Sequence, residues 1–235
     1  MAASKALFSL SFLLCSLPAI ISQSFIRIPS DRSVVDNDIY CESWRLSVET
    51  NNSGKWSLVP SSCASYVEKY MNGDKFLSDS EVAFDNMLAY AATVEVGSDG
   101  KDAWIFDVDE TLISNLPYYK LYGEATLLPV SLRFYKKLQQ LGFTIILLTG
   151  RTESQRTVTV QNLLKTGYSH WSRLILRNTT EKNDTALVFK SRRRAELAKE
   201  GYKLHGCSGD QWSDLVGYPM AKRIFKVPNP LYYLS

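Results

Sequence analysis

Histidine is scarce in this sequence, since only His170 and His205 carry an imidazole among 235 residues. This scarcity argues against enzymes with a histidine nucleophile and against binuclear metal centres that need several imidazoles. No cysteine is followed by an arginine six residues later, which excludes a catalytic loop built on that pair. The GxxxxGK[ST] pattern of a nucleotide-binding loop is also missing. We expect His170 in a surface loop and His205 hydrogen-bonded on a strand.

The sequence also has little net charge, because 27 basic side chains face 24 acidic ones and leave a formal charge of +3. An excess this small does not favour nucleic acid as a partner. The only dense basic stretch is Lys190–Arg194, and a helix face exposed to solvent is its simplest interpretation. Internal repeats and low-complexity tracts are absent, so the length allows one sizeable globular domain, or one with an extension.

Long apolar runs are missing except at the N-terminus. Residues 1–24 contain one early cation, Lys5, then an apolar run from Ala6 to Leu14, and small residues around Ser24. This pattern predicts a secretory signal peptide that is cleaved near Ser24. A membrane anchor is the alternative, but serines and Pro18 interrupt the run and keep it short. No other stretch is apolar enough to span a bilayer, so we expect no membrane contact after cleavage.

The four cysteines leave an odd number in the secreted chain, because Cys15 is removed with the signal peptide. Cys41 and Cys63 bracket a polar loop and are the natural disulfide pair in an oxidising compartment. Closing that loop would stabilise the fold by roughly 3 kcal/mol on the chain-entropy model. We expect Cys207 to be a small buried residue.

Three asparagines fit the acceptor pattern for N-linked glycosylation. They are Asn51, Asn178 and Asn183. The pattern is frequent by chance but meaningful in a secreted chain, so we predict a glycoprotein.

Two regions of the remaining chain differ in their pattern. Residues 25–100 show polar loops and two helical stretches, Ser62–Met71 and Ser78–Thr93, without a strong strand pattern. Ser78 and Glu81 have the spacing of a capping box, which predicts that the second helix begins there. We interpret residues 25–100 as a helical extension that packs on a core formed by residues 101–235.

The core region alternates between short, mostly apolar segments and helical ones. The predicted strands are Ala103–Phe106, Thr144–Leu148, Arg173–Leu176 and Lys203–Cys207, and the predicted helices are Ser131–Leu141, Thr152–Lys165 and Ser191–Glu200. Each helix is followed by a glycine, Gly142, Gly167 or Gly201, which adopts positive φ without strain. This alternation predicts an α/β fold with a Rossmann-like, mostly parallel sheet and helices on both faces.

Polar side chains gather where these strands end. They are Asp107 and Asp109 after the first strand, Thr149, Gly150 and Arg151 after the second, Lys190 beyond the third, and Asp210 and Asp214 after the fourth. Ligands bind beyond the carboxyl ends of the strands in such sheets, so we expect these groups to converge. Carboxylate oxygens suit Mg²⁺, and Thr149, Lys190 and the metal can stabilise the negative charge of a phosphoryl group.

The spacing of Asp107 and Asp109 suits a reaction in two steps, since residues i and i+2 of an extended segment share a face. One can bind metal and attack phosphorus, and the other can give a proton to the leaving oxygen and later activate water. Other interpretations remain open for the neighbours. Thr149 is also suited to cap the helix predicted near Thr152, Arg151 fits a substrate contact or an ion pair, and Asp214 fits a helix cap.

The motifs DVDET, LLTGR, Lys190 and GDxxxD, in this order, resemble the haloacid dehalogenase superfamily of Mg²⁺-dependent phosphotransferases. The longer segments WIFDVDETLISNLPYY, GDQWSDLVG and FKVPNPLYYLS resemble plant acid phosphatases related to the class B acid phosphatases. That family includes the vegetative storage proteins, and the likeness covers about residues 35–235.

The resemblance implies a role for each motif residue. Asp107 is the nucleophile and a metal ligand, and Asp109 is the acid/base that also binds the metal through its backbone carbonyl. Thr149 and Lys190 hold the phosphoryl group, with Gly150 counted among the phosphate-binding residues. Asp210 completes the Mg²⁺ site, and Asp214 supports it from the next layer of residues.

We therefore expect a secreted or vacuolar acid phosphatase that hydrolyses small phosphomonoesters through an aspartyl-phosphate intermediate. The family implies that a homodimer is possible. The alternative is a vegetative storage or defence glycoprotein whose phosphatase activity is weak or incidental.

Overall fold

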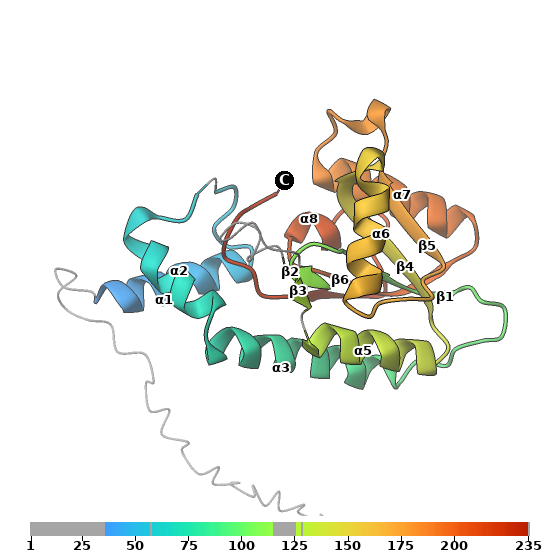
Figure 1. Cartoon of the computed structure of the whole chain (residues 1–235), viewed down its shortest axis with the longest axis horizontal. Helices are drawn as coiled ribbons and strands as arrows, with labels where there is room; N and C mark the ends of the chain where they lie inside the picture. Colours follow the sequence, from blue (N-terminus) through green and yellow to red (C-terminus); the bar gives the residue numbers. More distant parts are fainter. Residues whose placement is uncertain (1–35, 57, 115–125, 128, 235) are drawn as a thin grey trace, which may run out of the picture. The chain divides into compact units, whose positions relative to one another are not determined.

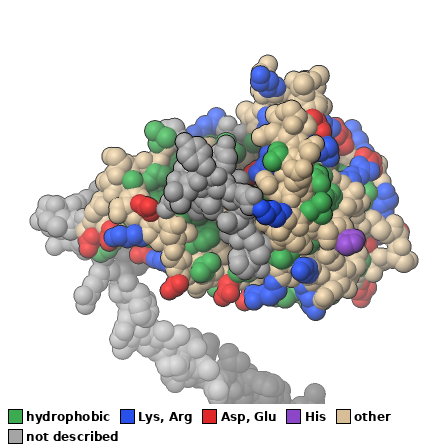
Figure 2. Space-filling model, viewed as in Figure 1, with side chains coloured by type: hydrophobic (Ala, Val, Ile, Leu, Met, Phe, Trp, Pro, Cys, Tyr) green, Lys and Arg blue, Asp and Glu red, His purple; other side chains and the backbone are tan. Residues whose placement is uncertain are grey.

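The computed structural model of the chain describes residues 36–56, 58–114, 126–127 and 129–234. The predicted signal peptide, residues 1–24, lies outside these ranges and stays a prediction. Within them, no helix combines the length and the apolar character that crossing a bilayer requires. Acidic and basic side chains are interspersed over the face of the described residues that Figure 2 shows, in line with the small net charge.

A five-stranded sheet in the order β5-β4-β1-β6-β7 forms the centre of the molecule. All four strand pairings are parallel. The strands are β1 (Asp102–Phe106), β4 (Thr144–Thr152), β5 (Arg173–Arg177), β6 (Lys203–Gly209) and β7 (Arg223–Lys226), and a separate antiparallel pair joins β2 (Ile113–Ser114) to β3 (Thr126–Leu127). The four predicted strands are confirmed, whereas the edge strand β7 was missed because four residues carry little pattern of their own.

Helices cover both faces of this sheet (Figure 1). They are α1 (Asn37–Glu49), α2 (Ala64–Met71), α3 (Asp74–Ala91), α5 (Pro129–Gln140), α6 (Arg156–Lys165), α7 (Ala186–Lys199) and α8 (Trp212–Leu215), with 3₁₀ turns η1 (Ser61–Cys63), η2 (Glu153–Gln155) and η3 (Thr179–Glu181). The predicted mostly parallel α/β fold is therefore confirmed.

Strand β1 shows how the two faces are filled, since successive side chains of a strand point to opposite faces. Trp104 and Phe106 pack against α3 and α5, which lie side by side in Figure 1. Ala103 and Ile105 pack on the other face against Phe189 of α7. Because this strand is buried on both faces, its successive side chains from Ala103 to Phe106 are all apolar, which explains the continuous apolar run in the sequence.

The predicted glycine ends of the helices are confirmed. Gly142, Gly167 and Gly201 follow α5, α6 and α7 with φ of 88°, 92° and 89°. This left-handed backbone carries no steric penalty for glycine, so each helix can turn back toward its next strand.

The N-terminal helices differ from the prediction. Helix α1 was not predicted, and α3 begins at Asp74 rather than at Ser78. Gly73 supplies the extended backbone before the first turn, and the buried Phe76 already packs on α2, so the apolar stripe starts earlier. Ser78 and Glu81 are exposed within the helix, where their spacing places them on one face without a capping role.

The cysteine predictions are confirmed. Cys41 in α1 and Cys63 in η1 form a disulfide with their Cα atoms 5.3 Å apart. Cys207 is a buried free thiol, and burial raises its pKa to about 12. The disulfide therefore ties α1 to the start of α2 across 22 residues of chain.

Replacing both Cys41 and Cys63 with alanine should lower the free energy of unfolding by roughly 3 kcal/mol, because the unfolded chain loses a covalent constraint. Denaturant unfolding measures this change. Wild-type protein reduced with a thiol reagent is the matched control, since it keeps every side chain, and it should unfold at the same denaturant concentration as the double variant. An unchanged midpoint in both would show that the disulfide adds no stability.

At the amino end of the sheet, a buried hydrogen bond joins β1 to β6. His205 Nε2 lies 2.7 Å from Asp102 Oδ1, and the Gly97 N–H donates to Asp102 Oδ2 at 2.8 Å. Burial by itself raises the pKa of Asp102, but Gly97, His205 and Lys203 together hold that pKa below its ordinary value. His205 is thus satisfied on a strand as predicted, and His170 is exposed.

Asp102→Asn should lower the free energy of unfolding by roughly 1–3 kcal/mol at neutral pH, because the buried charged hydrogen bonds are lost. A carboxyl whose pKa is lowered by folding stabilises the protein above its unfolded pKa. The difference from wild type should therefore shrink as the pH falls below about 4. Urea unfolding across pH measures it, with the exposed Asp99→Asn as control. A difference that is independent of pH would contradict this account.

Candidate active site

Three carboxylates meet at the carboxyl ends of the two central strands. Asp107 follows β1 directly, and its N–H donates to the Ser208 carbonyl of β6 at 2.9 Å. Asp210 follows β6, and Asp214 lies in α8. One oxygen from each of Asp107, Asp210 and Asp214 lies within 4.8 Å of the others, and all three residues are buried. The structure brings these three acids together at the strand ends, as the sequence predicts.

Lys190 is the cation of this cluster. Its Nζ lies 2.6 Å from Asp107 Oδ1 and 2.5 Å from Asp214 Oδ1. Thr185 caps α7, so this helix begins at Ala186 rather than at the predicted Ser191, and Lys190 lies one turn inside it. From there its side chain reaches the strand ends with only 4% of the residue exposed.

The basic run Lys190–Arg194 is not a fully solvated helix face. Arg194 is fully buried one helical turn after Lys190, and its NH1 donates to the Asp214 carbonyl at 2.6 Å while its Nε donates to the Pro219 carbonyl at 2.9 Å. Residues four apart share a helix face, so both cations point at the same loop. Arg194 thereby fixes the backbone that carries Asp214.

The charges of the cluster do not balance, because the Lys190 ammonium group pairs with only two of these three carboxylates. Burial is the main cause that raises the pKa of Asp107 well above its ordinary value, and repulsion from Asp214 and Asp210 adds to it. Burial and Asp214 raise the pKa of Asp210 to about 6. The pKa of Lys190 is raised by its two aspartate partners in spite of its burial. A site with excess negative charge and only hard oxygen donors fits a divalent cation.

Asp210 is held by two side-chain amides. Gln211 Nε2 donates to Asp210 Oδ2 at 2.8 Å, and Asn229 Nδ2 donates to the same oxygen at 2.6 Å. Among the described residues, the other oxygen, Oδ1, accepts a long 3.4 Å contact from the Thr111 hydroxyl. Neither amide was identified from the sequence, although Asn229 lies in the segment FKVPNPLYYLS that carried the family resemblance.

Gly209 explains how Asp214 comes so close to β6. A Cβ atom at position 209 would lie 2.3 Å from Asp214 Oδ2 and 2.5 Å from its Cβ. The Gln211 N–H donates to the same Asp214 Oδ2 at 2.9 Å. The glycine before Asp210 is therefore a packing requirement of the site.

Asp109 has different partners from the other acids. The Arg151 guanidinium binds it through two nitrogens, with Nε 2.9 Å from Oδ2 and NH2 2.6 Å from Oδ1. The Thr149 hydroxyl lies 3.4 Å from Asp109 Oδ2. Of the two interpretations left open for Arg151, the structure contains the ion pair.

Thr149 and Gly150 lie beside Asp109 rather than among the buried carboxylates. Thr149 accepts the Arg151 N–H at 3.2 Å and does not cap the following helix, since Thr152 is the residue before η2. Gly150 is exposed, and no atom lies within 4 Å of a Cβ placed there. A phosphate-binding role for both residues stays a prediction.

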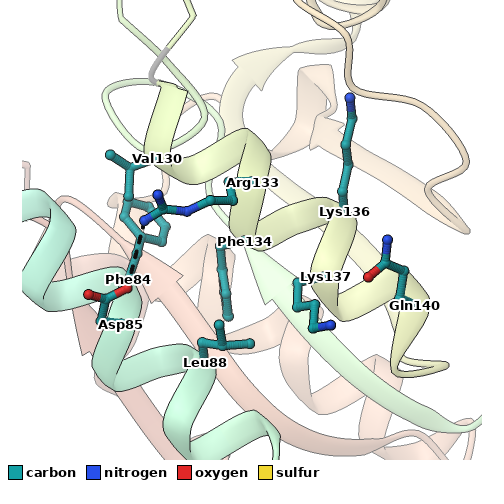
Figure 3. A pocket seen from close by; sticks show the side chains of 9 residues that line it. All are labelled: Phe84, Asp85, Leu88, Val130, Arg133, Phe134, Lys136, Lys137 and Gln140. Carbon is teal, nitrogen blue, oxygen red and sulfur yellow. Dashed lines mark ion pairs between the residues drawn. The ribbon is translucent and has the colours of Figure 1, made fainter.

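A groove of the described surface lies away from this site. It measures 380 Å³, and Figure 3 shows it between α3 and α5, lined by Phe84, Asp85, Leu88, Val130, Arg133, Phe134, Lys136, Lys137 and Gln140. None of the predicted site residues lines it. Its position gives no reason to move the candidate active site away from the strand ends.

The predicted glycosylation sites differ in their exposure. Asn51 and Asn183 are exposed, whereas Asn178 is half-buried and its Oδ1 caps η3 by accepting the Thr180 and Glu181 N–H groups. Attachment of a glycan at any of them stays a prediction.

Comparison with known proteins agrees with the motifs. Residues 29–235 match the family described as HAD superfamily, subfamily IIIB (acid phosphatase). Acid phosphatase 1 of Solanum lycopersicum is 44% identical over 216 residues, which cover 84% of this chain and 85% of the relative. Vegetative storage protein 1 of Arabidopsis thaliana is 38% identical over 214 residues, which cover 83% of this chain and 78% of the relative.

Among solved structures, the class C acid phosphatase from Bacillus anthracis with tungstate bound is similar in fold. It aligns with a TM-score of 0.57 at 21% identity and covers 72% of this chain and 84% of that one. The likeness supports the arrangement of the sheet and its helices.

Lys190→Met should destabilise the metal-free protein by about 3–5 kcal/mol at neutral pH, because two buried carboxylates lose the ammonium group that they share. Urea unfolding in the presence of a chelator measures this loss. Arg192→Met is the matched control on the same helix. Its ion pair with Asp184 is more exposed, so the change should stay within about 1 kcal/mol. Equal losses in the two variants would show that Lys190 has no special electrostatic role.

Proposed function

This chain belongs to the HAD superfamily, subfamily IIIB (acid phosphatase), and on that premise we propose that it is a Mg²⁺-dependent hydrolase of small phosphomonoesters. The observation that carries the proposal is the convergence of Asp107, Asp210 and Asp214 with Lys190 at the strand ends. Buried acids with too little positive charge among them are expected where a cation and a phosphoryl group bind.

Asp107 and Asp210 would hold the Mg²⁺ ion, together with the backbone carbonyl of Asp109. When bound, the ion supplies positive charge that stabilises the phosphoryl group and lets the Asp107 carboxylate stay ionised. Asp214 would hold Lys190 in place, as their 2.5 Å contact supports.

The reaction would proceed in two steps. An oxygen of Asp107 attacks phosphorus, the bond between phosphorus and the ester oxygen breaks, and the departing oxygen takes a proton from the Asp109 carboxyl. In the second step a water molecule attacks phosphorus and gives a proton to Asp109, and the bond to Asp107 breaks. Lys190 and the Thr149 hydroxyl donate to the phosphoryl oxygens as charge spreads over them.

The disulfide supports an oxidising compartment as the location of the protein. The disulfide between Cys41 and Cys63 forms and persists in the secretory pathway and beyond it. Together with the predicted signal peptide and glycosylation sites, it supports an extracellular or vacuolar glycoprotein. Nothing in the described residues favours a nucleic acid partner, and a homodimer remains a proposal from the family resemblance.

A storage role is the second candidate, and the similarity to vegetative storage protein 1 of Arabidopsis thaliana favours it. Storage requires a stable and abundant chain but no turnover. The two candidates therefore differ in whether the acids at the strand ends perform chemistry, and activity measurements separate them.

Purified protein should hydrolyse a chromogenic phosphomonoester with Mg²⁺ and lose that activity in a chelator. Asp107→Asn should reduce hydrolysis to the level of a mock preparation, because the nucleophile is gone. Asp109→Asn should lower kcat by roughly 10²–10⁴-fold, the usual contribution of general acid–base catalysis. The exposed Asp85→Asn on α3 is the matched control and should retain wild-type kcat.

Mass spectrometry of protein quenched during turnover should find the phosphoryl adduct on Asp107 and none in Asp107→Asn. Equal hydrolysis by wild type and Asp107→Asn would indicate a contaminating phosphatase. Folded wild-type protein without any hydrolysis would favour the storage role.

A further inference from the structure

The C-terminal segment, residues 226–234, connects the candidate metal site to the N-terminal helices. It begins at the end of β7, where the Val227 N–H donates to the Gly209 carbonyl at 2.9 Å. From there it continues past Asp210, where Asn229 makes its amide contact. Neither the motifs nor the two-step reaction assigns this segment a role.

The segment contacts the site at two points besides Asn229. Gln211, which donates one amide hydrogen bond to Asp210, also donates to the Tyr232 carbonyl at 3.1 Å and accepts the Leu234 N–H at 2.9 Å. Burial is the first cause that raises the pKa of Tyr232, and the negative charge of Asp210 is the second. The tyrosine hydroxyl therefore lies within the electrostatic range of the acidic cluster.

Glu49, near the end of α1, holds the same segment from the other side. Its Oε1 accepts the Asn229 N–H at 2.9 Å, and its Oε2 lies 2.6 Å from the Lys226 ammonium group. Both side chains of this ion pair are only 13% exposed, so solvent screens it less than a surface pair. The backbone of Asn229 is thus fixed by one residue of α1 while its side chain reaches Asp210.

Apolar contacts add to this attachment. Leu231 packs against the buried cluster of α2 and α3 that contains Val67 and Tyr70, and Tyr233 lies 6.2 Å from Trp56 between ring centroids. The Asn229 Oδ1 accepts the Leu231 N–H at 2.9 Å, which closes a turn and orients the amide nitrogen toward Asp210.

We propose that Asn229 is a positioning residue for the metal ligand Asp210, and that the C-terminal segment is a strap through which Glu49 of α1 supports the metal site. This inference rests on the proposed function, since it concerns the same Mg²⁺ site. It adds two residues, Asn229 and Glu49, that no motif assigns to that site.

The physical reason is the occupation of the two Asp210 oxygens. Gln211 and Asn229 together fix Oδ2, which leaves Oδ1 as the oxygen directed to a metal. Without Asn229 one donor remains, and the carboxylate can rotate out of that orientation. Residues that orient a metal ligand typically contribute roughly 10–100-fold to metal affinity.

The test measures Mg²⁺ binding by isothermal titration calorimetry on the full chain after chelation. Asn229→Ala should raise the dissociation constant for Mg²⁺ by roughly 10–100-fold. Asn86→Ala is the matched control, because this exposed asparagine bonds only within α3, to the Val82 carbonyl, and it should bind like wild type. Thermal unfolding in chelator reports general destabilisation separately.

Glu49→Ala provides a second route that leaves every residue around the ion unchanged. It should weaken Mg²⁺ binding by roughly tenfold, the lower end of the same range, since it removes only the anchor of the strap. This variant also keeps the inference testable if Asn229→Ala does not fold.

The outcomes separate the two proposals. Wild type that binds no Mg²⁺ overturns the proposed function and this inference with it. Wild type that binds Mg²⁺ while Asn229→Ala binds equally well, even with a lower unfolding temperature, overturns only the positioning role. An unchanged dissociation constant in Glu49→Ala overturns the strap and leaves the role of Asn229 in place.

Discussion

Repulsion among buried carboxylates is the constraint on which the rest of this structure depends. Lys190 pairs with Asp107 and Asp214, Asp210 lies beside them, and one oxygen of each acid lies within 4.8 Å of the others. In a low-dielectric environment such a group is expensive without a further cation or a proton. Burial and the repulsion between the acids raise the pKa values of Asp107 and Asp210 in the metal-free chain.

Several groups of the fold hold the acids in place in spite of their mutual repulsion. Gly209 gives Asp214 room beside β6, Arg194 fixes the backbone of Asp214, and two amides orient Asp210. These supports come from β6, from the residue before α8, from α7 and from the C-terminal segment. They keep the acids close together, so a bound cation or a proton on one of the acids is what relieves their repulsion.

The sequence predicts those parts of the fold that local patterns encode. Short, mostly apolar segments predicted four of the five strands of the sheet, glycines predicted the helix ends, and acidic residues after the strands predicted the cluster. Features that depend on contacts between distant residues were not predictable in this way. Asn229 meets Asp210 across 19 positions and Glu49 across 180, and the burial of Arg194 depends on carbonyl groups 20 or more residues away. The start of α3 was misjudged because Ser78 and Glu81 fit a capping box and an exposed helix face equally well.

The free-energy cost of burying these three carboxylates also helps to decide between a storage role and a catalytic role. A storage protein gains nothing from three buried acids that oppose folding in the metal-free state, since apolar residues of similar volume would pack as well or better. The fold nevertheless commits Lys190, Arg194, Asn229 and Gln211 to holding those acids together. An arrangement that lowers stability locally and is supported from several sides is expected where chemistry takes place. Abundance and turnover are compatible in one molecule, so a storage role does not by itself account for the site, whereas the phosphoryl transfer that we propose would account for it.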